Sequence, residues 1–191
     1  MDSYYPVMLR LKNRLCTVIG GGHVAKRKLR GLLDAGAEVR AVAPQMLAGI
    51  EKLENIEIRR KNYEPQDIDG SFIVIAATDD AELNKRILSD AAERSMLAMS
   101  AEGGGDFING AVRREGSITV QASSGVPALS AQLCRDLKLT AYAAAAELLS
   151  KYRRKIKRGD YEELLSERAL RLAAQAPEEY EKLIMKYAEH D

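Results

Sequence analysis

Three consecutive glycines, Gly20, Gly21 and Gly22, follow a short apolar run and precede a segment with helical spacing of apolar residues. Gly20, Gly22 and Ala25 fill the defined positions of the pattern Gly-x-Gly-x-x-Gly/Ala, which binds the pyrophosphate of a dinucleotide. The first glycine allows a tight turn, the second lets the ligand approach the backbone, and the small third residue keeps the helix close to the sheet. Because the helix N-terminus adds free N–H groups, this segment predicts a dinucleotide-binding turn.

Short apolar runs, which predict strands, alternate along this part of the chain with segments of helical spacing, which predict helices. Strands that alternate with helices favour a doubly wound parallel sheet. We therefore expect an α/β fold in which residues 1–112 form an NAD-binding, Rossmann-like domain. Strands are predicted at 15–19, 39–43, 56–60, 72–77 and 96–100, and helices at 23–35, 46–53 and 81–94; residues 7–11 are a short strand or a loop, and residues 62–70 are a loop.

The end of the second predicted strand departs from the usual dinucleotide fold, which carries an acid there for the ribose hydroxyls. This chain has Val42-Ala43-Pro44-Gln45, with neither an acid nor an arginine for a 2′-phosphate. The spacing therefore does not distinguish NAD from NADP.

The pattern changes beyond residue 112. Residues 117–122 form a strand with alternating polarity, and Pro127 stands near the start of a helix, where its missing N–H is harmless. From residue 128 to the end the chain is predicted to be helical, with breaks at Gly159 and Pro177. We expect a mixed region at 113–147 and a helical C-terminal domain at 148–191. The small residues at 141–146 permit close helix packing, either in a dimer or within the chain.

Composition excludes several classes of protein. The chain has 191 residues, of which 46% are hydrophobic, so a normal core is expected and disorder is not. Lys and Arg number 29 and Asp and Glu 28, which gives no overall field for nucleic acid. Cys16 and Cys134 are predicted to be reduced core thiols, which fits the cytoplasm. No apolar run has the length of a membrane span and no signal peptide is expected.

Several short motifs occur in a fixed order along the first 140 residues. Together they resemble the precorrin-2 dehydrogenase family, which is the dehydrogenase and ferrochelatase module of siroheme synthases. The motifs are Tyr5-Pro6-Val7, the glycine turn through Lys28, Ala41-Val42-Ala43-Pro44, residues 75–80 with Asn84, Phe107-Ile108 with Ala111, and residues 122–125 with 127–129.

The resemblance implies NAD-dependent oxidation of precorrin-2 to sirohydrochlorin by a homodimer, with 113–147 as the dimerisation region. It implies a tetrapyrrole as partner, with no nucleic acid and no membrane. The glycine turn would hold the pyrophosphate, the second strand's end would lie along the adenosine, and the fourth strand's end would lie near the ribose or nicotinamide. The cofactor-binding residues so implied are Gly20, Gly21, Gly22, His23, Val24, Ala43, Pro44, Thr78 and Asp79.

Members of this family carry an aspartate shortly after the fifth strand. Counting forward from the fourth-strand motif places Glu102 on that aspartate, whereas counting back from the following aromatic motif places Ser100 there. Because the oxidation releases protons, the reaction needs a group that accepts one, and we expect Glu102 to be the general base. Asp106 is the second candidate, and a solvated loop acid is the alternative reading of Glu102.

Three residues are candidate substrate ligands: Ser124, Asp106 and Arg113. Ser124 either binds a substrate carboxylate or caps the helix that follows. Arg113, with its neighbour Arg114, suits a substrate with eight acid side chains. The most basic segment, residues 151–158, is first a solvated face, then a steering surface for substrate, and last a nucleic-acid site.

No metal site is expected, because His23 and His190 are far apart and there is no Cys/His cluster. Two other functions stay open. One adds sirohydrochlorin ferrochelatase activity at the same site. The other is a non-catalytic tetrapyrrole-binding or NAD-binding protein, which the altered loop around Glu102 would explain.

Overall fold

The computed structural model describes residues 4–188, and His190 lies outside that range. The chain divides into two compact units, Met1–Ile108 and Asn109–Asp191. The division falls close to the expected end of the nucleotide-binding domain at residue 112.

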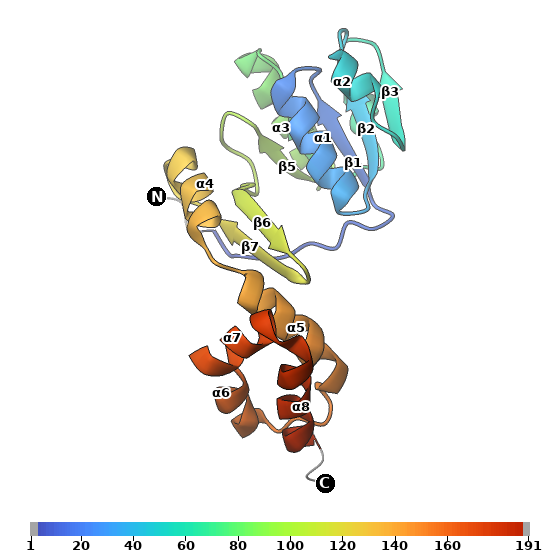
Figure 1. The fold of residues 1–191 in the computed structure, drawn as a ribbon. Helices are drawn as coiled ribbons and strands as arrows, with labels where there is room; N and C mark the ends of the chain where they lie inside the picture. Colours follow the sequence, from blue (N-terminus) through green and yellow to red (C-terminus); the bar gives the residue numbers. More distant parts are fainter. Residues whose placement is uncertain (1–3, 189–191) are drawn as a thin grey trace. The chain divides into compact units, whose positions relative to one another are not determined.

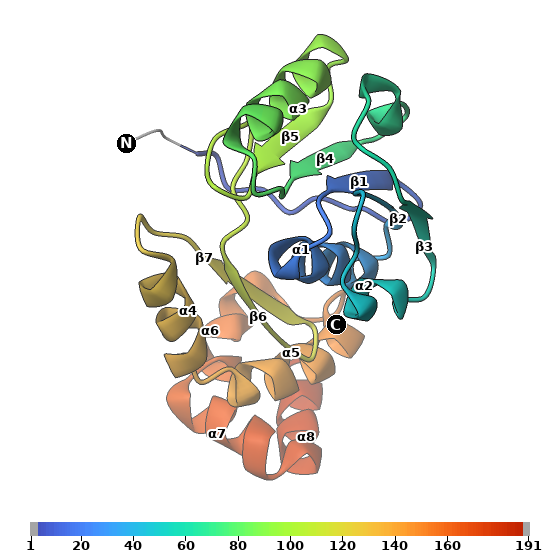
Figure 2. The same ribbon diagram turned by 90° about the horizontal axis from the view of Figure 1, so that it is seen from above.

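The first unit, coloured blue to green in Figure 1, is built on a five-stranded parallel sheet. The strand order is β3-β2-β1-β4-β5, and Figure 2 labels all five strands. In the register of the sheet, Val18 lies opposite Ala41 on one side and Ile75 on the other. The central strands are continuous apolar runs because both of their faces are covered. The sheet confirms the predicted doubly wound fold. The strands are β1 (Leu15–Ile19), β2 (Glu38–Val42), β3 (Ile56–Arg59), β4 (Ile73–Ala76) and β5 (Leu97–Ser100).

Helices cover both faces of this sheet (Figure 2). On one face α1 (His23–Asp34) and α2 (Ala48–Glu51) contribute Leu29 and Ile50, which pack in one cluster with Val18. On the other face α3 (Ala81–Glu93) and the 3-10 helix η1 (Pro65–Ile68) contribute Ile87 and Ile68, which pack with Val74. Alternate residues of each strand thus enter two separate apolar layers.

Local chemistry explains where the structure differs from the prediction in this unit. The short helix predicted at 46–53 is confined to α2, because Leu47 is extended and donates its N–H to the Gly21 carbonyl at 3.0 Å. The predicted loop at 62–70 contains η1, which a capping box between Glu64 and Asp67 closes. Residues 7–11 have no regular secondary structure.

The second unit begins with an antiparallel hairpin of β6 (Ala111–Glu115) and β7 (Ile118–Ala122). A two-residue turn with Gly116 at φ 55° joins the strands. β6 was not predicted from the sequence, because its last three residues, Arg113, Arg114 and Glu115, are all charged and break the alternation of polar and apolar residues. α4 (Pro127–Asp136) packs on this hairpin and starts at Pro127, as predicted.

The rest of the second unit is helical, as predicted. Its core surrounds Tyr180, which is fully buried and donates its hydroxyl to the Leu164 carbonyl at 2.8 Å. Ala145 is buried in the same cluster, so the small-residue stretch at 141–146 packs within the chain. The helices are α5 (Thr140–Tyr152), η2 (Arg158–Asp160), α6 (Tyr161–Leu164), α7 (Glu167–Gln175) and α8 (Pro177–Ala188).

The breaks of this helical region are more numerous than predicted. The expected breaks occur, with Gly159 inside η2 and Pro177 at the start of α8. Residues 137–139 also separate α4 from α5, and the boundary expected at 147 lies within α5. None of the helices between residues 4 and 188 is long and apolar enough to cross a membrane.

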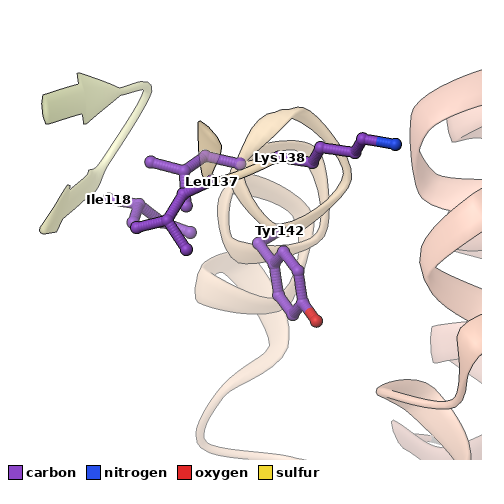
Figure 3. A pocket seen from close by; sticks show the side chains of 5 residues that line it. Ile118, Leu137, Lys138 and Tyr142 are labelled. Atoms are coloured by element: carbon purple, nitrogen blue, oxygen red, sulfur yellow. The ribbon is translucent and has the colours of Figure 1, made fainter. Parts of the chain in front are cut away.

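The second unit also carries an open hollow (Figure 3). Ile118 and Leu137 line it with apolar carbons, and Lys138 extends away from them. Leu139 and Tyr142 complete the wall. None of the predicted site residues lines this hollow.

Candidate functional site

The predicted cofactor residues converge on one edge of the parallel sheet. They lie in the loops that follow β1, β2 and β4 or in the first turn of α1, and Glu102 follows β5. The chain leaves β1 toward β2 on one side and returns to β4 on the other, so the strand order reverses beside β1. Open α/β sheets bind their ligands at such a switch point.

Two of the three glycines are required by the fold itself. Gly20 has φ 133°, and a Cβ there would overlap the carbonyl oxygen of Ala77. A Cβ on Gly21 would overlap the carbonyl oxygen of Gln45. The turn is therefore packed between the loops that follow β2 and β4.

Gly22 differs from the other two, because no contact within the fold requires a glycine at this position. Its φ is −88°, which other residues adopt, and beyond its chain neighbours Gly21 and His23 no heavy atom lies within 4 Å of the position that its Cβ would take. It is the N-cap of α1, where no side chain caps the helix and the first turn has no acid. Open space beside uncapped N–H groups is the arrangement that a pyrophosphate needs. The residues present therefore fit a dinucleotide.

The end of β2 lacks charged groups, and the two arginines at the end of β3 are paired with carboxylates. Ala43 is buried and Pro44 is exposed. Arg59, at the end of β3, binds Glu57 at 2.7 Å and Asp67 at 3.1 Å. Arg60 binds Glu51 at 2.7 Å.

Asp67 is the buried member of this charged group. Burial alone would raise the pKa of Asp67, but the Glu64 N–H and the cations of Arg59 and Lys61 outweigh it and hold that pKa below its usual range. The Asp67 side chain is only 2% exposed, so these partners replace the water that it loses.

Hydrogen bonds fix the loop after β4. The Thr78 hydroxyl donates to Oδ1 of Asn84 at 2.7 Å, and the Thr78 N–H donates to the same oxygen at 3.2 Å. Asp80 caps α3 by accepting the N–H groups of Glu82 and Leu83. Asp79 is exposed between these anchors. Thr78 and Asp79 thus lie on a fixed loop at the sheet edge.

Glu102 lies on a tight turn that follows β5. Its side chain is exposed, and its Oε2 accepts a hydrogen bond from Nδ2 of Asn84 at 3.4 Å. Its N–H donates to the buried Ser100 hydroxyl at 3.2 Å. The sequence left Ser100 and Glu102 as alternatives for the position of the family's aspartate. In the structure this hydrogen bond joins the two residues.

Asp106 closes this turn against β5. Its Oδ2 accepts the Ala98 N–H at 2.9 Å, and its own N–H donates to the Ala98 carbonyl at 2.7 Å. Gly105 has φ 99°, and a Cβ there would overlap Ala98. The Asp106 carboxylate is engaged in holding the loop that presents Glu102.

The other two candidate substrate ligands lie in the second unit. The Arg113 guanidinium donates to the last carbonyls of α4, including Arg135 at 2.8 Å and Leu137 at 2.6 Å, and pairs with Glu115 at 2.9 Å. The Ser124 hydroxyl donates to the Val126 carbonyl at 2.8 Å in the turn before α4. Both groups thus have structural partners in their own unit.

His23 is exposed in the first turn of α1, and Val24 is partly exposed beside it. Within residues 4–188, no group of three or more His, Cys, Asp or Glu side chains is placed to hold a metal ion.

A model of the family described as "Putative NAD(P)-binding" matches residues 7–111, which is more than half of the chain. The chain belongs to this family. The match covers the sheet, the glycine turn and the Glu102 loop, and it supports a nicotinamide dinucleotide as the cofactor.

The chain is also similar to siroheme synthases. The chain is 35% identical to the siroheme synthase of Chromobacterium violaceum over 135 residues, which cover 67% of this chain and 29% of that protein. It is 34% identical to the siroheme synthase of Pseudomonas entomophila over 165 residues, which cover 81% and 36%. The chain thus spans about a third of the length of these relatives.

A solved structure matches almost the whole chain. This structure, titled SirC, precorrin-2 dehydrogenase, superposes with a TM-score of 0.77 at 25% identity and covers 96% of this chain and 100% of that one. The match confirms the predicted Rossmann-like fold and the resemblance to the precorrin-2 dehydrogenase family.

Proposed function

We propose that this protein oxidises precorrin-2 to sirohydrochlorin with NAD in siroheme biosynthesis. The observation that carries the proposal is the match to a precorrin-2 dehydrogenase along the full length of that chain. The nucleotide site supports it, because Gly22 leaves open space at an uncapped helix N-terminus.

A bound nicotinamide ring would supply the hydride acceptor of this reaction. The backbone at residues 20–22 and the first turn of α1, with His23 and Val24, would hold the pyrophosphate. Ala43 and Pro44 would lie along the adenosine. Thr78 and Asp79, fixed by Asn84 and Asp80, would orient the ribose and nicotinamide end.

The charges around β2 favour NAD over NADP. A 2′-phosphate is usually bound by an arginine near the end of the second strand. The chain has only Ala43, Pro44 and Gln45 there, and Arg59 and Arg60 on the neighbouring strand are paired with carboxylates. Neither of these two arginines is thus dedicated to a 2′-phosphate.

Glu102 would be the general base. Oxidation of precorrin-2 removes two hydrogens, one as a hydride to the nicotinamide and one as a proton. The Glu102 carboxylate is exposed at the edge that would bind the cofactor, and only Oε2 accepts a bond from Asn84, so Oε1 is available to take that proton. Arg113 and Ser124 remain candidate ligands for the substrate carboxylates, and Asp106 remains a candidate substrate ligand and the second candidate base.

We also propose that the protein is a homodimer. Leu129 and Leu133 lie four residues apart on one side of α4, Val126 precedes that helix, and each of the three is more than half exposed. An exposed apolar stripe of this kind is typical of an interaction site.

Cys16 and Cys134 are buried free thiols, which supports a location in the cytoplasm.

The assay is an anaerobic incubation with precorrin-2 and NAD, with absorbance followed for NADH and sirohydrochlorin together. We expect both signals to grow in proportion. Tight binding of precorrin-2 without NADH would instead identify a tetrapyrrole carrier. Loss of sirohydrochlorin on adding ferrous ion, compared with a protein-free control, would identify ferrochelatase activity in addition.

A further inference from the structure

Asn84 joins the two loops that carry the proposed chemistry. It lies in the first turn of α3 and is only 2% exposed. Its Oδ1 accepts from the N–H and the hydroxyl of Thr78, and its Nδ2 donates to the Thr78 carbonyl at 3.1 Å and to Oε2 of Glu102 at 3.4 Å. One buried amide thus holds the loop after β4 and the loop after β5.

The orientation of this amide is fixed by its partners. An asparagine side chain has two donors and one oxygen with two lone pairs, and all four are used here. Turning the amide over would place its NH₂ group against the Thr78 N–H and its oxygen against two acceptors, the Thr78 carbonyl and Glu102. Because Asp80 also fixes the first turn of α3, the second N–H of Asn84 is held toward Glu102.

We propose that Asn84 is a positioning residue for the reaction. It binds Oε2 of Glu102 and leaves Oε1 to accept the substrate proton, and it keeps the carboxylate in register with the cofactor loop at Thr78. The 3.4 Å separation is long for a hydrogen bond, and such contacts often shorten when substrate binds. The catalytic part of this inference rests on the proposed role of Glu102.

The test replaces the amide by a carboxylate of the same shape, Asn84→Asp, in the full chain. The midpoint at which the Glu102 carboxyl takes up its proton is followed by NMR with ¹³C-labelled glutamate, and Glu102→Gln identifies the signal. Two like charges 3.4 Å apart raise that midpoint by about one pH unit even at the dielectric constant of water, and by more when one of them is buried. Asn55→Asp, before β3 at the opposite end of the strands, adds the same charge as a control and leaves the midpoint unchanged.

A second variant, Asn84→Ser, removes the amide without adding charge and covers the case in which Asn84→Asp does not fold. Asn84→Ser should lower kcat about tenfold, within the range of general-base effects. An unchanged Glu102 midpoint in Asn84→Asp, or a wild-type kcat in Asn84→Ser, would overturn the proposal.

The NMR measurement does not depend on turnover. If Asn84→Asp moves the Glu102 midpoint but the wild-type protein forms no NADH from precorrin-2, the contact is upheld and the dehydrogenase function is refuted. If the wild-type protein is active but Asn84→Asp leaves the midpoint unchanged, the role of Asn84 is refuted and the function stands.

Discussion

Replacing Gly22 by serine should separate stability from cofactor binding. Gly22 is the N-cap of α1, and serine is a preferred residue there because its hydroxyl accepts an N–H of the first turn. The backbone at Gly22 is extended and no atom lies within 4 Å of the new Cβ, so the substitution causes no clash. The same side chain would occupy the space that we assign to the pyrophosphate.

Gly22→Ser should change the free energy of unfolding and the affinity for NAD by different amounts. Serine in place of glycine at an N-cap gains a few tenths of a kcal/mol, so the free energy of unfolding stays the same or rises slightly. NAD binding loses free N–H donors and space, and a loss of at least about 1.4 kcal/mol corresponds to a tenfold weaker Kd. Gly20→Ala is the contrasting variant, because φ 133° and the overlap with Ala77 should lower the free energy of unfolding by about 1–3 kcal/mol.

The assay combines urea unfolding with calorimetric titration of NAD. Gly22→Ser should unfold at the wild-type urea concentration or above it and bind NAD at least tenfold more weakly. Wild-type affinity in this variant would refute the assignment of the glycine turn. A destabilised Gly22→Ser protein would refute the reading that the fold leaves this position free.

Three further predictions concern other parts of the molecule. Glu102→Gln should lower kcat about 100-fold in the NADH assay with unchanged NAD affinity, and wild-type turnover would exclude it as the base. Because the pKa of Asp67 is lower in the folded protein than in the unfolded chain, its stabilisation is present at neutral pH and is lost as pH falls below about 4. Asp67→Asn should therefore destabilise the protein at pH 7 more than at pH 3 in urea unfolding, and an equal loss at both would contradict this. Leu129→Glu should convert the proposed dimer to a monomer in sedimentation, and an unchanged mass would place the interface elsewhere.

The first unit was largely predictable because its signals are local. The central strands are mostly apolar, β2 and β3 alternate polar and apolar residues, and each strand is found within one or two residues of its predicted bounds. The strand β6 was missed because three of its five residues are charged and its partner β7 supplies the pairing. Pairing with a neighbouring strand is not visible in the alternation of a single strand.

In the candidate site, the glycine turn could be predicted from the sequence, whereas the contact between Asn84 and Glu102 could not. Spacing alone located the glycine turn, and only the structure separates Gly22, which the fold leaves free, from Gly20 and Gly21, which it requires. Asn84 was visible as part of a motif, but its role depends on Glu102 being brought to it by the pairing of β4 with β5. No local pattern encodes a contact between residues so far apart in the chain.

The arginine at position 113 shows the same limit. Its charge suggested a substrate ligand, whereas its hydrogen bonds to the end of α4 depend on the packing of α4 against the hairpin.

The most direct test of the central claim is the stoichiometry of the anaerobic reaction with precorrin-2 and NAD. The proposed chemistry removes one hydride for each precorrin-2 oxidised, so one NADH should form for each sirohydrochlorin, and the rate should fall sharply in Gly22→Ser. Sirohydrochlorin formed without NADH, or no sirohydrochlorin at all from the folded wild-type protein, would contradict the account.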